Sequence, residues 1–66
     1  MFYNLACSYS LTDQFDSAAA ALKRAFELGY RDFNWLARDP DLRKLRKQPV
    51  FQEVAEVIRQ FKNGPK

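Results

Sequence analysis

The sequence predicts an all-α fold, organised as one domain over residues 1–66. Apolar residues recur at steps of three and four along most of the chain, which is the spacing of an amphipathic helix and not of a strand. Five alanines fall within residues 17–28, and turn-forming residues separate the periodic segments. A chain of 66 residues has room for a single core. We therefore expect one small helical domain.

The first two helices are expected at residues 2–11 and 17–28. The first carries its apolar side chains along one face: Phe2, Leu5, Ala6 and Tyr9. Asp16 stands where its carboxylate can cap the second helix, and Gly29 supplies a left-handed stop. Small alanine side chains let a neighbouring helix approach closely, with Leu22 filling the space beside them. The two helices should therefore form an antiparallel hairpin.

Shorter helical pieces are expected after the hairpin. Asp32 can cap a two-turn helix, and Asp39 followed by Pro40 can begin another, because proline suits the first helical position. Trp35, the only tryptophan, is expected to fasten these capping helices onto the hairpin.

A longer helix is expected from Pro49 to Lys62. Its apolar side chains fall on one face: Phe51, Val54, Ala55, Ile58 and Phe61. Residues 63–66 include glycine and proline, so this tail should fray.

The spacing of the first thirty residues resembles one tetratricopeptide repeat (TPR), a helical hairpin of about 34 residues. The matching positions are Phe2, Leu5, Ala6 and Tyr9 in the first helix, and Ala18, Leu22, Ala25 and Tyr30 after it. Residues 28–51 resemble the segment that closes many bacterial repeat arrays. The resemblance implies a TPR-like antiparallel helical hairpin over residues 1–30, followed by capping helices and a C-terminal helix over residues 31–62.

The resemblance also implies a function in protein–protein interaction or assembly. TPR arrays are interaction scaffolds whose partners lie in a groove lined by the first helix of each repeat. By resemblance, the groove-facing residues that bind a partner would be Tyr3, Cys7, Ser10 and Leu11, and Phe2 would add a contact on the N-terminal face.

A single repeat cannot bury both of its faces, since about three repeats are usually needed for a stable stack. The face formed by Phe2 and its neighbours is therefore expected to stay open and to meet another protein. A second copy of the chain is one candidate, and the chain could equally be the end of a longer array.

Positive charge is concentrated in the second half of the chain. The net charge is +3, and residues 31–66 hold nine basic and five acidic residues. The cluster from Arg38 to Lys47 suggests an alternative function, a small basic nucleic-acid-binding protein. Acidic partners or phosphates would then contact Arg43, Lys44, Arg46 and Lys47. Asp39 and Asp41 interrupt the cluster, which favours a solvated face over nucleic-acid binding.

Catalysis finds no support in the sequence, so we expect no enzyme activity, cofactor, metal or small-molecule substrate. Without histidine, the serine hydroxyls lack their usual base. Cys7 has no basic neighbour in sequence and is expected to be a packing residue. A single cysteine fits a reducing compartment, and we expect a cytoplasmic protein. The longest apolar run, Ala18 to Leu22, is far shorter than the roughly 20 residues of a membrane span.

Overall fold

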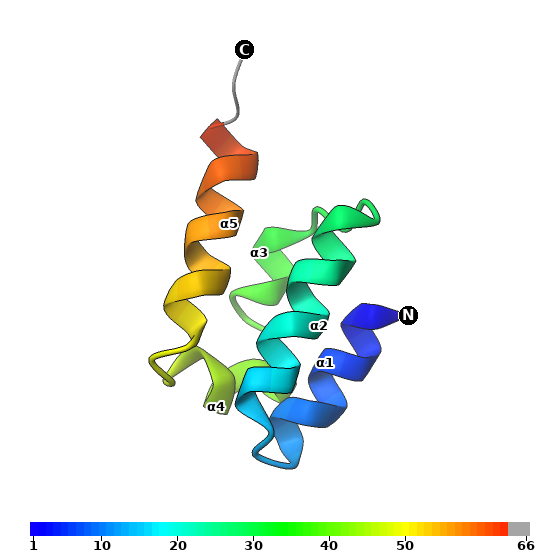
Figure 1. Ribbon diagram of the computed structural model, residues 1–66, viewed down its shortest axis with the longest axis vertical. Coiled ribbons are helices and arrows are strands. Elements are labelled where there is room, and N and C mark those ends of the chain that lie inside the picture. Colours follow the sequence, from blue (N-terminus) through cyan, green and yellow to red (C-terminus); the bar gives the residue numbers. More distant parts are fainter. Residues whose placement is uncertain (64–66) are drawn as a thin grey trace.

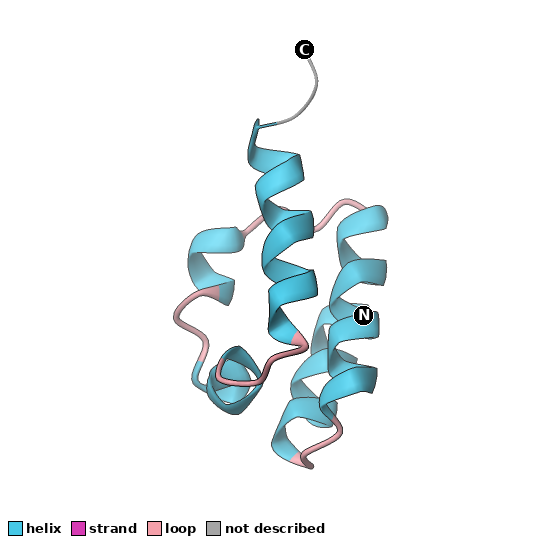
Figure 2. Cartoon of the chain, turned by 60° about the vertical axis from the view of Figure 1, so that its left-hand side comes forward, coloured by secondary structure: helices cyan, strands magenta, loops and turns pink. Residues whose placement is uncertain are grey.

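A computed structural model describes residues 1–63. Helices make up most of this range and it contains no strand (Figure 2), so the predicted all-α fold is confirmed. In chain order, the elements are α1 (Phe2–Leu11), α2 (Phe15–Glu27), α3 (Phe33–Leu36), the 3-10 helix η1 (Pro40–Leu42), α4 (Arg43–Arg46) and α5 (Phe51–Asn63). In Figure 1, α2 lies between α1 and α5.

The helices α1 and α2 lie side by side and run in opposite directions (Figure 1). The bounds of α1 are those predicted from its apolar spacing, and Ala6 is fully buried against α2. Asp13, with a φ of 63°, turns the chain between the two helices. Short polar side chains such as that of aspartate are among the few that adopt this left-handed conformation readily.

The N-terminus of α2 differs from the prediction. Gln14 occupies the N-cap position, but its side chain makes no capping hydrogen bond, and Asp16 lies inside the first turn of the helix. A carboxylate is still favourable there, because the free amide groups of the first turn carry partial positive charge. Gly29, with a φ of 111°, follows the C-cap of α2, as expected of a glycine stop.

The predicted capping residues of the short helices are confirmed. Asp32 accepts a hydrogen bond from the Trp35 amide at 3.2 Å, and Asp39 accepts one from the Asp41 amide at 2.9 Å. Pro40 occupies the start of η1, where its missing N–H leaves no internal bond unmade. Pro49 does not begin α5 itself, which starts two residues later.

The core centres on Phe26 of α2, which has no exposed surface. Its ring meets the ring of Phe33 edge-on at 5.3 Å and that of Phe61 at 6.1 Å. The other large, fully buried apolar residues come from α2, α3, η1, α4 and α5: Leu22, Leu36, Leu42, Leu45 and Val54. Every helix after α1 thus contributes to one core.

Several side chains expected on apolar faces are exposed, including Ala55 and Phe61 of α5. Trp35 is 44% exposed, and its neighbour Leu36 is the α3 residue that enters the core. Leu5 is 40% exposed, although the spacing of α1 placed it with buried Ala6. Of the tail expected to fray, Asn63 is instead the last residue of α5, and residues 64–66 lie outside the described range.

Candidate functional site

The inner face of α1, which we define as Tyr3, Cys7, Ser10 and Leu11, was expected to be a groove for a partner. The structure places η1 and α4 of the same chain against α1. Ser10 has no exposed surface and Cys7 is 8% exposed, so neither side chain is open to another protein. In this structure they therefore do not line an open groove, as the resemblance implied they would. Tyr3 is half-buried, and only Leu11 remains well exposed on this face.

Residues 39–46, which we call the closing segment, are tied to the inner face through the carboxylate of Asp39. Tyr3 Oη donates a hydrogen bond to Asp39 Oδ2 at 2.5 Å, and Cys7 Sγ donates to the same oxygen at 3.7 Å. Asp39 is only 4% exposed. A buried carboxylate is stable only when its oxygens are hydrogen-bonded, so these donors favour the closing segment in this position.

Burial keeps the two donors protonated. Desolvation by burial, aided by the negative charge of Asp39, raises the pKa of the Cys7 thiol to about 11. Burial and the hydrogen bond to Asp39 also raise the pKa of the Tyr3 hydroxyl above its ordinary value. Both side chains therefore remain hydrogen-bond donors at neutral pH. A protonated thiol is a poor nucleophile, which removes the usual chemistry of a lone cysteine.

Cys7, Asp39 and Asp41 also have the residue types of a metal site. One ligand atom from each lies within 4.8 Å of the others. A metal would need the thiolate form of Cys7, however, and burial opposes that form. Asp39 also already accepts hydrogen bonds at both of its oxygens. These three residues therefore fit a buried, hydrogen-bonded contact between α1 and η1 better than a metal centre.

A shallow groove lies on another side of α1, between α1 and α2. We call it the outer groove, and its volume is about 330 Å³. It is lined by Phe2, Leu5 and Tyr9 from α1, and by Ser17, Ala20, Ala21 and Arg24 from α2. Leu5 and Cys7 are two residues apart, which is about 200° around a helix. The outer groove is thus open while the inner face of the same helix is covered.

The exposed side of α2 carries opposite charges toward its two ends, although only Arg24 lines the outer groove and Asp16 borders a separate hollow with Pro49 and Val50. Arg24 lies over the Phe2 ring, with its guanidinium carbon 5.8 Å from the ring centroid, and it pairs with Glu27 at 2.6 Å. Asp16 lies in the first turn and is exposed. An open face at Phe2 was predicted, but its extension over Leu5 and α2 and these charges were not. The sequence contains one indication of this arrangement. Ala20 is four residues from Asp16 and four from Arg24, so these three side chains share one face of the helix.

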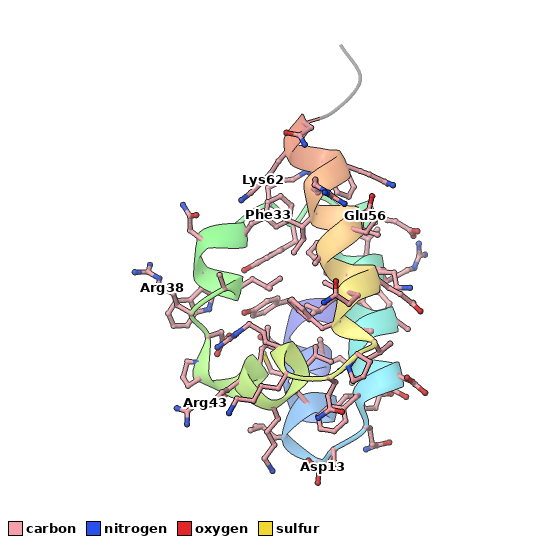
Figure 3. All side chains as sticks on the ribbon, turned by 90° about the vertical axis from the view of Figure 1, so that its left-hand side faces the viewer. Asp13, Phe33, Arg38, Arg43, Glu56 and Lys62 are labelled. Carbon is pink, nitrogen blue, oxygen red and sulfur yellow. The ribbon has the colours of Figure 1, made fainter. Side chains whose placement is uncertain are left out.

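The basic cluster divides into structural and exposed residues. Arg46 is half-buried, and its Nη1 donates to the carbonyl oxygens of Leu36 at 2.9 Å and Asp39 at 2.8 Å. Arg46 therefore holds α3 and η1 together, a structural role that the sequence did not predict. Lys44 pairs with Asp13 across 3.4 Å. Arg43 and Lys47 are exposed, and Figure 3 shows Arg38 and Arg43 pointing outward on the same side.

Comparison with known proteins finds a plant relative. No family model matches the chain, and no solved structure matches it. Over 59 residues, 89% of this chain, it is 41% identical to a protein of Arabidopsis thaliana whose name describes it as chloroplastic. The chain spans only 17% of the length of that relative. The plant source of the relative does not fit the bacterial origin that the repeat resemblance suggested.

Proposed function

We propose that this chain is a non-catalytic protein–protein interaction module of TPR type, and that it docks another protein on its outer groove. The observation that carries the proposal is an open groove lined by Phe2, Leu5 and Tyr9, next to an inner face that the chain itself covers. Leu5 is 40% exposed, although a domain of this size has few large apolar side chains with which to build its core. Apolar surface of this kind is typical of protein interfaces.

The TPR assignment is part of the proposal. It is supported by the helix bounds Phe2–Leu11 and by the close, opposed packing of α1 and α2. In a repeat stack, each hairpin is covered by neighbours on two sides. Here the closing segment and α5 cover one side of the hairpin, and the outer groove lies on the other.

The absence of catalysis also remains a proposal. Within residues 1–63, the one group of three neighbouring Cys, Asp or Glu side chains is Cys7, Asp39 and Asp41, and burial holds its thiol protonated. No helix in that range is long and apolar enough to cross a membrane. We propose a cytoplasmic location for this chain, whereas the name of the plant relative puts that protein in the chloroplast. A fluorescent fusion of the full chain distinguishes the two compartments.

A photo-crosslinking side chain at position 5 tests the docking proposal. Illumination in a cell extract should attach another protein at this position, and excess wild-type chain should compete for it. Excess Leu5→Asp chain should not compete, because a carboxylate in the groove would be desolvated without a partner. The same crosslinker at Gln60, an exposed position of α5, is the control. Equal labelling at both positions, or competition by both chains, would contradict the proposal.

A second candidate function is weak binding of an acidic protein or of nucleic acid. It is supported by Arg38 and Arg43, which point outward on the same side, and by exposed Lys47 nearby in sequence. Fluorescence anisotropy with labelled mixed-sequence RNA tests it, starting at about 50 mM salt and increasing from there. Loss of binding in Arg43→Ala/Lys47→Ala, with unfolding unchanged, is expected. Absence of binding at the lowest salt would end this candidate.

A further inference from the structure

We propose that the occupant of the outer groove is a second copy of this chain, related by a two-fold axis that passes near Ala20. This inference rests on the proposed function, since it assigns the partner of the same groove. It commits to an antiparallel contact, in which α2 of one copy runs opposite to α2 of the other.

The first observation is the order of side chains along the exposed side of α2. Asp16, Ala20 and Arg24 are spaced by four residues and all three are exposed. Residues at this spacing lie on neighbouring positions of one helix face. Along the axis, each charge lies about 6 Å from Ala20, one toward each end of the helix. Along α2, this face therefore carries an acidic, then a small, then a basic side chain.

The second observation is that this order is complementary to itself in only one orientation. A two-fold axis at Ala20 places Asp16 of each copy opposite Arg24 of the other, so that two ion pairs form. A parallel arrangement would instead place like charges together. Electrostatic patterns of this kind set the orientation and register of an interface.

The shape of the surface fits the same arrangement. Ala20 is the smallest side chain on the exposed face of α2, and it lets two helices approach closely at the axis. Leu5 and Tyr9 border the groove beside it and would be covered by the second copy. In a two-fold interface the same apolar patch is buried twice, once from each copy.

Lys23 and Arg24, the two basic residues of α2, already have ion-pair partners within one chain. Lys23 of α2 is paired with Glu53 of α5 at 2.8 Å, on the side of α2 that faces α5. Arg24 is paired with Glu27 of its own helix, but both side chains are more than half exposed. An exposed pair of this kind contributes little, so Arg24 is free to exchange Glu27 for Asp16 of the second copy.

A charge-exchange experiment tests the arrangement. Sedimentation equilibrium on the full chain should show a reversible dimer, and Asp16→Lys or Arg24→Glu alone should weaken it at least about tenfold, because each creates two like-charge contacts. The double variant Asp16→Lys/Arg24→Glu should restore dimerisation to within about threefold of wild type. The neutral variants Asp16→Asn and Arg24→Gln should weaken dimerisation less. They replace the charge-reversed variants in the test if a reversed charge disturbs folding.

The matched control reverses an exposed pair far from the groove. Glu56→Lys and Arg59→Glu, alone or together, should leave the dimer unchanged, since both residues lie on α5. A wild-type chain that stays monomeric at several hundred micromolar, or a double variant as weak as the single ones, would overturn the inference. If a monomeric chain still gives a competed crosslink to another protein at position 5, the second copy is wrong and the proposed function stands. If neither is seen, both are wrong.

Discussion

Tyr3, in the first turn of α1, donates a hydrogen bond to Asp39, which lies 36 residues later and caps η1. The Tyr3 ring is also stacked on Tyr30, with ring centroids 4.6 Å apart. One side chain thus links the start of the chain to the segment after α2 and to the segment that closes the domain. This link explains why the inner face of α1 is covered and why the outer groove is the surface left for another protein.

Removing the carboxylate of Asp39 should destabilise the domain strongly. In Asp39→Ala the cap of η1 is lost and the Tyr3 hydroxyl loses its acceptor, so we expect about 2 to 4 kcal/mol less free energy of unfolding. Asp39→Asn keeps an oxygen for the cap and should cost less. Urea unfolding followed by circular dichroism measures both variants. A loss below about 0.5 kcal/mol in Asp39→Ala would show that the junction does not hold the closing segment.

Truncation of Leu22 in α2 should destabilise the domain more than truncation of Leu5 in α1. Leu22 is fully buried, and Leu22→Ala should cost about 2 to 5 kcal/mol, enough to unfold much of so small a domain. Leu5 is 40% exposed, so Leu5→Ala should cost about 1 kcal/mol or less while weakening any contact at the outer groove. Thermal unfolding of the two variants side by side checks this. Equal losses would place Leu5 in the core after all.

Replacement of Ser10 should stabilise the domain. Its hydroxyl is fully buried and makes no hydrogen bond within residues 1–63. Ser10→Ala removes the unpaired group and adds a better helix former, so we expect a gain of about 1 kcal/mol in the free energy of unfolding. Chemical denaturation gives the value, and Ser8→Ala, an exposed position of the same helix, is the control. A loss of stability in Ser10→Ala would mean that the hydroxyl has a partner.

Stability should fall at alkaline pH. The pKa of the Cys7 thiol is raised from its ordinary 9.0 to about 11 in the folded chain, so the folded state holds this proton more tightly than the unfolded state. The resulting stabilisation is complete below pH 9 and is lost as the pH rises toward 11. The Tyr3 pKa is raised in the same sense and adds to the loss at higher pH.

The contribution of Cys7 can be separated from that of other groups. The decrease in unfolding free energy from pH 8.5 to 11 should be smaller in Cys7→Ala than in wild type, because only wild type loses the protonated thiol. An identical decrease in both proteins would show that the thiol is not buried as described.

Local features of the fold could be predicted from the sequence because their causes are local. The bounds of α1, the caps Asp32 and Asp39, and the glycine stop after α2 each depend on residues a few positions apart. The start of α2 was predicted two residues too late, because Asp16 is favourable both as a cap and inside the first turn.

The position of the site could not be predicted in the same way. Helical spacing shows that Phe2, Leu5 and Tyr9 share a face, but α1 has a second face of small and aromatic residues, including Tyr3 and Cys7. Which face meets the rest of the chain depends on the hydrogen bond to Asp39, a contact between residues far apart in sequence. Trp35 illustrates the same limit, since Leu36 beside it entered the core instead.

The most direct test of this account is an NMR titration of the isotopically labelled chain with itself, from about 20 µM to about 1 mM, with amide shifts followed residue by residue. The account predicts concentration-dependent shifts at Leu5, Tyr9 and Ala20, which border the outer groove, and constant shifts at Tyr3, Cys7 and Ser10 beneath the closing segment. Shifts confined to Tyr3, Cys7 and Ser10 would show that the closing segment leaves the inner face to admit another chain, and would contradict it.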